Sequence, residues 1–300
     1  MSDHASGRTA LHPDEALALV EAWDYAPEVE TVPIARALGR ALAGDLPALV
    51  DQPPFDKSAM DGFAYGRASA GADAGAGPSP DGRWRVATLV AAGHGLPAAA
   101  LGPGECARIM TGAPLPPGAT RVQRIEWTAD ERGPEGPLVR FTKPESETNV
   151  IRRGENQKAG DPLVSRRVLL AQDIGILASS GYAEVPVARR PIVGVLSTGD
   201  ELAAPGVSLP GGAIYDSNGP QLVAQAALAG CDARYLGIVH DEPGALERAV
   251  RAAAADCDVL VVSGGVSMGD FDYVPRTLAG AGLAPRFHGL AMRPGKPTFF

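Results

Sequence analysis

The chain has 300 residues, with 27 Lys and Arg against 35 Asp and Glu, so its formal net charge is −8 and its sequence pI is about 5.2. This acidic balance argues against nucleic acid as the main partner, because binding to a phosphate backbone needs a basic surface. The length favours two domains or one large domain, and the 45% of hydrophobic residues is enough to fill sizeable cores.

The N-terminal stretch and the cysteines indicate in which cellular compartment the protein is expected. The first fifteen residues, MSDHASGRTALHPDE, contain neither the basic n-region nor the apolar h-region of a signal peptide, and no apolar run is long enough to cross a bilayer. Cys106, Cys231 and Cys257 are an odd number without metal-ligand spacing, which is typical of reduced thiols. The sequence therefore predicts a cytoplasmic protein without a membrane partner.

The first part of the chain is predicted to be helical. Pro13, followed by Asp14 and Glu15, is typical of a helix start, and an apolar stripe continues this helix to about Tyr25. A second helix is predicted over residues 34–42, where its role would be packing.

Residues 51–64, DQPPFDKSAMDGFA, crowd several carboxylates, a lysine and a serine between two prolines and Gly62. This composition suits a loop that presents Asp61 to a site, and it suits a purely structural turn equally well.

A small β-rich region is predicted next. Residues 68–82 are low in complexity and poor in large apolar groups, which indicates a surface excursion. Short β-type runs then alternate with Gly/Pro turns, at residues 84–91, 106–110 and 121–127.

Two polar turns border this β-rich region. Thr111 follows a strand and offers a hydroxyl, although a plain Gly/Pro turn is the more common meaning of this pattern. Arg152 and Arg153 precede Gly154 and could clamp a phosphate through bidentate hydrogen bonds, whereas a solvated basic turn is the more common alternative.

The second half alternates strands and helices. After a helical stretch at 167–181, short turns connect predicted strands and helices in a regular order, which indicates a parallel sheet with right-handed crossovers. The strands are predicted at 192–196, 233–239, 258–262 and 285–292, and the helices at 221–228, 243–255 and 273–281.

Polar residues follow each of the first three of these strands. STGDE begins at Ser197, Asp241 comes after the second strand, and the glycine-rich SGGVSMG begins at Ser263. Ligands of parallel sheets bind beyond the carboxyl ends of the strands, where glycine-rich backbone can turn its N–H groups toward an anion. Asp270 and Asp272 could hold a hard cation there, although a tight strand-to-helix turn with a solvated acidic start is the alternative.

Two further motif observations limit the function. In the segment Tyr215-Asp216-Ser217-Asn218, either Ser217 or Asn218 could be a plain helix N-cap. Neither G-x-G-x-x-G opening a helix after a strand nor G-x-x-x-x-G-K-[ST] is present, which argues against a dehydrogenase and a P-loop ATPase.

Seven motifs occur together in the order expected of one family. They are PFDKSAMDGFA (54–64), MTGAPLP (110–116), IRRGE (151–155), STGDEL (197–202), YDSN (215–218), SGGVSMGDFDY (263–273) and RPGKP (293–297). From about residue 12 to the last residue, the chain resembles the molybdopterin molybdenumtransferases and the E domain of gephyrin.

The resemblance implies an α/β fold, with a three-layer parallel-sheet domain following an elongated N-terminal helical region and a small inserted β-rich domain. The implied boundaries are 1–50 with 143–190 for the N-terminal helical and linker domain, 51–142 for the inserted β-rich domain, and 191–300 for the α/β molybdopterin-binding domain. It also implies an enzyme of molybdenum cofactor biosynthesis that inserts molybdate into adenylylated molybdopterin and releases AMP, with Mg²⁺ as cofactor. The implied partners are a second copy in a homodimer and a molybdopterin adenylyltransferase.

The resemblance also implies roles for individual residues. The catalytic positions would be Asp61, Thr111, Glu201, Asp241, Asp272, Arg293 and Lys296. Substrate-binding positions would be Ser197, Thr198, Gly199, Asp200, Ser263, Gly264, Gly265, Ser267, Gly269, Arg152 and Arg153. Mg²⁺ would lie between Glu201 and Asp272.

Three departures from the family pattern favour an alternative. Asn156 replaces a carboxylate, Gly289 stands where relatives often have lysine, and relatives continue beyond Phe300 into a C-terminal β-rich domain. The sequence therefore predicts a C-terminally shortened member, for which the alternative function is a non-catalytic molybdopterin-binding or scaffold module.

Overall fold

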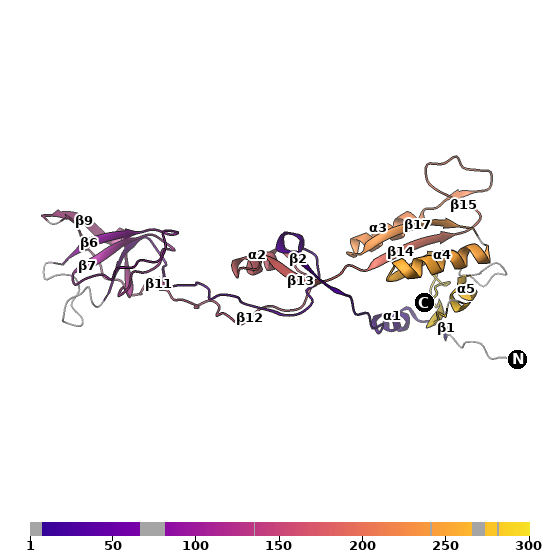
Figure 1. The fold of residues 1–300 in the computed structure, drawn as a ribbon, viewed down its shortest axis with the longest axis horizontal. Coiled ribbons are helices and arrows are strands. Elements are labelled where there is room, and N and C mark those ends of the chain that lie inside the picture. Colours follow the sequence, from indigo (N-terminus) through magenta and orange to yellow (C-terminus); the bar gives the residue numbers. More distant parts are fainter. Residues whose placement is uncertain (1–7, 67–81, 135, 241, 266–273, 281) are drawn as a thin grey trace. The chain divides into compact units, whose positions relative to one another are not determined.

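The computed structural model describes residues 8–66, 82–134, 136–240, 242–265, 274–280 and 282–300, and the chain forms two compact units (Figure 1). We call residues 1–32, 39–43 and 186–300 the α/β unit, and residues 33–38 and 44–185 the β-sheet unit. The three-domain division expected from the sequence stays a prediction. No helix within the described ranges has both the length and the apolar character needed to span a membrane.

The α/β unit is built on a parallel sheet of three strands. Its order is β17 (Asp232–Val239), β14 (Ile192–Thr198), β18 (Val259–Ser263), and β14 pairs in parallel with both neighbours. These three predicted strands are confirmed. Six of the seven residues of β14 are buried, because the central strand is covered on both faces.

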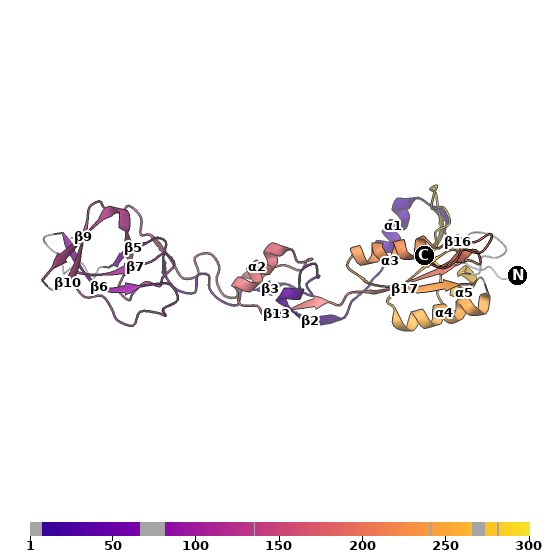
Figure 2. The same cartoon turned by 90° about the horizontal axis from the view of Figure 1, so that it is seen from above.

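Helices lie on both faces of this sheet. α3 (Asn218–Leu228) contacts β14 and β17, whereas α4 (Pro243–Asp256) contacts all three strands and α5 (Val274–Gly280). Figures 1 and 2 show α3 and α4 on opposite sides of the sheet. Under α4, burial removes a continuous apolar cluster from water: Leu196, Leu246, Val250 and Val274.

The predicted strand over 285–292 exists but has an unexpected partner. β19 (Phe287–Leu290) pairs in parallel with β1 (Arg8–Leu11), and in the described part of the chain it is not a member of the three-stranded sheet. Leu11 and Phe287 are buried together with Ala16 of α1 (Pro13–Glu21). The start of α1 agrees with the prediction, and His12 caps it by accepting a hydrogen bond from the Asp14 N–H at 3.3 Å.

The helix predicted over 34–42 is wrong. Only one 3₁₀ turn forms, η1 (Ile34–Arg36), and Gly39 then takes a positive φ of 73°. Ala43 donates its N–H to Pro186 O at 3.1 Å, and Leu42 bridges to Val187 of β13 (Glu184–Ala188). The backbone here is extended because it pairs with distant chain, which the local periodicity does not reveal. β13 also pairs with β2 (Val29–Pro33).

A six-stranded sheet forms most of the β-sheet unit. Its order is β8 (Arg121–Arg124), β5 (Gly62–Tyr65), β7 (Glu105–Ile109), β6 (Arg83–Val90), β10 (Gly136–Phe141), β9 (Thr128–Gly133). The predicted run 121–127 is divided between β8 and the 3₁₀ turn η3 (Ile125–Trp127). At this point the Arg124 N–H donates to Oε1 of Glu145 at 3.0 Å, so a side chain takes the place of a neighbouring strand.

Short paired strands and one helix complete the described elements. β3 (Leu46–Pro47) pairs with β12 (Pro162–Val164), β4 (Lys57–Ser58) with β11 (Val150–Ile151), and β15 (Leu202–Ala203) with β16 (Ile214–Tyr215). α2 (Ala171–Ser179) is shorter than the predicted stretch 167–181. Asp173 accepts a hydrogen bond from the Leu170 N–H at 2.9 Å and pairs with Arg167, which holds the residues before α2 outside the helix.

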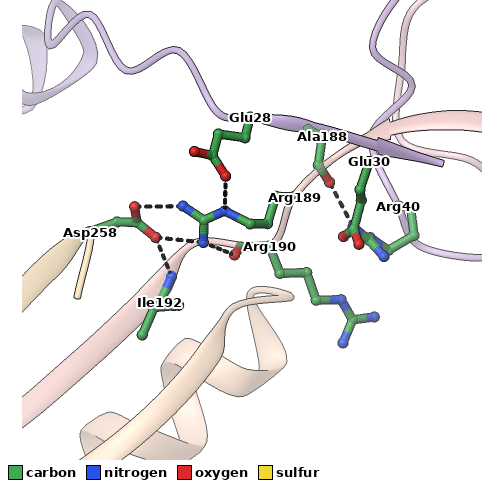
Figure 3. Close-up of polar contacts among 8 residues, drawn as sticks. All are labelled: Glu28, Glu30, Arg40, Ala188, Arg189, Arg190, Ile192 and Asp258. Carbon is green, nitrogen blue, oxygen red and sulfur yellow. Dashed lines mark hydrogen bonds and ion pairs between the residues drawn. The ribbon is translucent and has the colours of Figure 1, made fainter. Parts of the chain in front are cut away.

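An arginine clamp holds the start of the three-stranded sheet (Figure 3). Arg189 donates from both terminal nitrogens to Asp258, at 3.0 and 2.8 Å, and its Nε lies 3.3 Å from Oε2 of Glu28. Asp258 also accepts the N–H of Ile192 at 2.7 Å. The Arg189 guanidinium, followed by this N–H, keeps the pKa of Asp258 below its ordinary value. The clamp thus ties the chain before β2 to the first residues of β14 and β18.

We expect a double-mutant cycle of Arg189→Ala and Asp258→Ala, measured by urea unfolding, to give a coupling energy of about 1–2 kcal/mol. Both side chains are largely buried, at 29% and 19% exposure, and their fork is bidentate. The matched control is Glu247 with Arg251, an exposed pair four residues apart on α4, which should couple by at most about 0.5 kcal/mol. Equal coupling in the two pairs would contradict the clamp.

Candidate functional site

The carboxyl ends of the three parallel strands bring predicted site residues together. In the register of the sheet, Ser197 of β14 lies opposite Ser263 of β18 and Ile238 of β17. Asn218, the first residue of α3, donates from Nδ2 to Oγ of Ser263 at 3.1 Å. Ser263 and Asn218 thus form a polar edge where ligands of parallel sheets bind, whereas Ser197 is buried beneath it.

The buried carboxylate of Asp216 forms hydrogen bonds to residues next to this edge. Asp216 is 2% exposed, and its Oδ2 accepts hydrogen bonds from the hydroxyls of Ser197 at 2.7 Å and Tyr235 at 2.6 Å. Its Oδ1 accepts the N–H of Gly219 at 3.0 Å. A β-carbon at Gly219 would lie 2.5 Å from the same carboxylate, so glycine is needed for this close approach. The side chain of Asp216 joins β14, β17 and the start of α3.

The carboxylate of Asp216 is held in its ionised form. Burial raises its pKa, but the hydrogen bonds donated by the Gly219 N–H, Tyr235 and Ser197 outweigh burial, so the pKa of Asp216 lies below its ordinary value. Burial, together with the neighbouring Asp216, raises the pKa of Tyr235 to about 12. Tyr235 is therefore a stable donor in this network.

Sequence reasoning missed the role of Asp216. It favoured Ser217 or Asn218 as N-cap, but the side chain of Ser217 makes no capping bond and Asn218 donates to Ser263 instead. Asp216 takes the capping role by accepting from Gly219, three residues further on. The sequence pattern that could have indicated this role is an Asp three residues before a glycine at the start of a helix.

The glycine-rich loop begins in close contact with the central strand. Gly264 has φ +101°, and a β-carbon there would lie 2.2 Å from the carbonyl oxygen of Thr198. Gly265, with φ +61°, would place its β-carbon 2.8 Å from Val274. Both positions require glycine, so Gly264 and Gly265 bring the loop backbone against the end of β14.

Residues 199–201 lie beside this loop. Gly199 donates its N–H to Val239 O at 3.3 Å, and a β-carbon on Gly199 would lie 2.6 Å from Oε2 of Glu201. Glu201 therefore folds its carboxylate back over the end of β14. Asp200 lies 3.2 Å from Nδ1 of His240, at the end of the neighbouring strand. The predicted positions Asp241, Ser267, Gly269 and Asp272 lie outside the described residues.

Metal binding at this edge rests on its carboxylates. Asp200 and Glu201 are hard oxygen donors of the kind that Mg²⁺ prefers, and Mg²⁺ normally completes its shell with water and phosphate oxygens. No three His, Cys, Asp or Glu side chains are grouped in the described part of the chain closely enough to hold a metal ion. The carboxylate of Glu201 has the donor chemistry that fits Mg²⁺.

A second cluster lies in the β-sheet unit. Oδ1 of Asp61 accepts hydrogen bonds from the N–H of Thr111 at 2.6 Å and from its hydroxyl at 2.9 Å. These two bonds, in that order, together with the charge of Arg108, keep the pKa of Asp61 below its ordinary value. A β-carbon on Gly62 would lie 1.9 Å from Gln123 O, so this glycine allows β5 to start directly after Asp61. The structure thus brings together Asp61 and Thr111, which are 50 residues apart.

The two predicted arginines form ion pairs within the β-sheet unit. Arg152 donates to Asp56 at 2.7 Å, and Arg153 donates from Nε to Asp51 at 2.5 Å. The N–H of Arg153 also donates to Asp56 at 2.8 Å. These contacts hold the turn at Gly154 in place.

The RPGKP turn leaves two cations at the surface of the α/β unit. Arg293 and Lys296 are exposed, and within the described ranges their side chains form no ion pair or hydrogen bond. The carbonyl of Lys296 accepts the N–H of Leu290 at 2.8 Å, which closes the turn onto β19. Gly289 has φ +91°, a conformation that favours glycine.

Comparison with known proteins covers nearly the whole chain. Two family models match, the MoeA N-terminal region (domain I and II) over residues 11–181 and a probable molybdopterin binding domain over residues 194–300. A molybdopterin molybdenumtransferase of Bacillus subtilis (strain 168) is 37% identical over 293 residues, which is 97% of this chain and 67% of that protein. One from Nostoc sp. is 36% identical over 93% of this chain and 63% of its own length. The chain thus spans about two thirds of the length of these relatives.

Solved structures agree with this similarity. Two crystal structures of molybdopterin biosynthesis MoeA protein from Pyrococcus horikoshii superpose on 97% of this chain with TM-scores of 0.82 and 0.77, at 32% and 25% identity. The superposition covers 71% and 72% of those chains. The mixed α/β fold is therefore that of the MoeA structures.

Replacing Asp216 with Asn should destabilise the α/β unit by about 1–3 kcal/mol at neutral pH, measured by urea unfolding. Both oxygens of Asp216 accept hydrogen bonds, so an amide nitrogen would leave a buried donor without an acceptor. The control is Asp232→Asn, where an exposed ion pair with Arg234 is lost and the change should stay below about 1 kcal/mol.

The difference in unfolding free energy between wild type and Asp216→Asn should depend on pH, because the pKa of Asp216 is lowered in the folded state. A carboxylate with a lowered folded-state pKa stabilises fully above its unfolded pKa of about 3.9 and loses that effect as the pH falls through the folded pKa. The gap between wild type and Asp216→Asn should therefore be constant at neutral pH and narrow in acid. A gap that widens in acid would contradict this sign.

For the second cluster, Thr111→Val should raise the pKa of Asp61 toward its ordinary value, because it removes the hydroxyl donor and keeps the Thr111 N–H. Thr111→Ser keeps both donors and should leave the pKa of Asp61 unchanged. Carboxyl ¹³C NMR titration measures both, and identical pKa values in the two variants would show that the hydroxyl does not stabilise the carboxylate.

Proposed function

This chain belongs to the MoeA family, and we propose that it acts in molybdenum cofactor biosynthesis by inserting molybdate into adenylylated molybdopterin with release of AMP. The relatives that it matches are named molybdopterin molybdenumtransferases, which supports an enzyme of this type. Because the chain spans about two thirds of their length, this activity is proposed on the residues that it contains.

The observation that supports the proposal best is the edge formed by Asn218 and Ser263 at the ends of β14 and β18. Hydroxyl and amide groups and two positive-φ glycines meet at the carboxyl ends of parallel strands, where backbone N–H groups can approach an anion. The substrate carries a pyrophosphate, which is the ligand that such an edge suits. Gly199 and Asp200, with Ser263, Gly264, Gly265, Ser267 and Gly269, would bind it. Ser197 and Thr198 are buried and would position these residues, Ser197 through its hydrogen bond to Asp216.

The acidic residues would provide the second part of the site. Glu201, with Asp272 as the other proposed ligand, would hold Mg²⁺, and Asp241 would add a further carboxylate. When bound, Mg²⁺ neutralises charge that develops on the pyrophosphate as it is cleaved. Glu201 would present its carboxylate oxygens to the metal at the end of β14, close to the backbone of Gly199.

The remaining proposed residues divide by charge. Arg293 and Lys296 are exposed cations that would attract the anionic substrate and molybdate. Asp61, held ionised by Thr111, would act on the substrate as an acceptor. Arg152 and Arg153 would bind phosphate through the parts of their guanidinium groups that Asp56 and Asp51 leave open.

The proposed partners are a second copy of this chain and a molybdopterin adenylyltransferase, the class of enzyme that supplies the adenylylated substrate. Exposed apolar side chains support the homodimer. In the β-sheet unit they lie just after η1, just after β3, and in or just before α2: Leu38, Leu49, Val50, Val168, Leu170 and Ile176. The three-layer arrangement of the α/β domain is proposed on the same family basis.

The test uses the purified chain with adenylylated molybdopterin, molybdate and Mg²⁺, with AMP release as readout. We expect turnover by wild type and a loss on the order of 10²-fold in Glu201→Gln and in Asp272→Ala, because each removes a charge that acts on the pyrophosphate. The control is Glu247→Gln, an exposed carboxylate on α4, which should keep full activity.

Binding measured in parallel separates the two functions. Retention of adenylylated molybdopterin without AMP release would favour the non-catalytic binding or scaffold module. If wild type neither binds this ligand nor releases AMP, the proposed function is wrong.

A further inference from the structure

An open cavity of about 720 Å³ lies on the six-stranded sheet. One of its lining residues, Phe63, follows Asp61 by two positions. Phe63 of β5, Arg108 of β7 and Leu89 of β6 line it, and the register places these three residues directly beside one another. Met110 follows Arg108 by two residues and also lines the cavity, immediately before Thr111. Asp61 immediately precedes β5 and Thr111 follows β7, the two strands that contribute Phe63 and Arg108 to the cavity.

Two cations line the cavity, Arg108 and Arg132, and among the described residues neither forms an ion pair. Glu131 lines it but accepts hydrogen bonds from Arg83 at 2.6 Å and Arg140 at 3.0 Å, so its charge is balanced. Asp130 and Arg132 are both exposed there and oppose each other in sign. Arg108 is the half-buried cation of the two, whereas Arg132 is exposed.

Arg108 has its hydrogen-bond donors open. Its Cζ lies 5.2 Å from the centre of the Phe63 ring, and in the part of the chain that the structure describes its side chain forms no hydrogen bond or ion pair. The ring holds the guanidinium by a cation–π contact without using its N–H groups. A planar fork held this way is ready to bind an oxyanion through two parallel hydrogen bonds.

Arg108 also acts on Asp61. Its charge is one cause of the lowered pKa of that carboxyl, whereas the Asp61 Oδ1 is occupied by the two donors of Thr111. An oxyanion that enters beside Asp61 would be repelled by the carboxylate. The positive charge of Arg108 offsets this repulsion, so the oxyanion and the Asp61 carboxylate can lie in the same site.

We propose that Arg108 is the oxyanion-binding residue of the Asp61–Thr111 cluster, and that its guanidinium, held over Phe63, receives a tetrahedral oxyanion of the reaction. This inference rests on the proposed function, in which molybdate and the substrate phosphates are the available oxyanions. Leu89 and Met110 supply the apolar wall beside it.

The experiment measures binding of sodium molybdate and, separately, of AMP to the full chain by titration calorimetry. Arg108→Ala should weaken binding of one of the two probes about ten- to a hundredfold, the effect of losing hydrogen bonds to a charged group. Arg108→Lys keeps the charge without the fork and should lie between Arg108→Ala and wild type. The control is Arg132→Ala, which removes a cation from the same cavity and should change neither affinity.

The outcomes decide the inference and identify the anion. Weakened molybdate binding alone assigns Arg108 to molybdate, and weakened AMP binding alone assigns it to a phosphate. If Arg108→Ala and wild type bind both probes equally while wild type still releases AMP, this inference is wrong and the proposed function stands. If wild type binds neither probe and shows no turnover, both fail. Thermal unfolding of each variant shows whether it is folded, and Arg108→Lys provides a second variant in case Arg108→Ala does not fold.

Discussion

The central strand β14 is held at each end by one carboxylate, and the rest of the α/β unit depends on this. At its start, Asp258 accepts the Ile192 N–H and both terminal nitrogens of Arg189, so the strand begins beside β18 and the chain before β2 (Figure 3). At its end, Asp216 accepts the Ser197 hydroxyl and the N–H of Gly219. Six of the seven residues of β14 are buried between these two points, which fixes the strand in register with both neighbours.

Asp216 and Asp258, which hold β14, differ in their surroundings from Glu201 and Asp61, the carboxylates that we propose for ligand binding. Asp216 and Asp258 have their oxygens occupied by protein donors, and their lowered pKa values keep them ionised in that role. Glu201 and Asp61 lie at the surface beside glycine turns, where a substrate can reach them. Both oxygens of Asp216 and of Asp258 accept protein hydrogen bonds, whereas the two Thr111 donors reach the same oxygen of Asp61, Oδ1.

Much of the fold followed from local pattern. The β-branched run before Ser263 and the apolar run from Ile192 predicted buried strands, because a strand covered on both faces needs continuous apolar sequence. The helix over 34–42 failed, since Leu42 and Ala43 pair with β13, more than 140 residues away. The strand over 285–292 was placed correctly, but its pairing with β1 depends on a segment at the other end of the chain.

The sequence by itself determined the motifs, the alternation of strands and helices, and the meeting of Ser197 with Ser263, because parallel strands end at one edge. Only the tertiary structure decided that Asp216 caps α3, that Arg189 clamps Asp258, and that Arg108 lies over Phe63 with its donors open. Each of these contacts joins residues that strand register and packing bring together. The sequence around an arginine or aspartate is the same whether its side chain is paired or free, so it cannot reveal the contact.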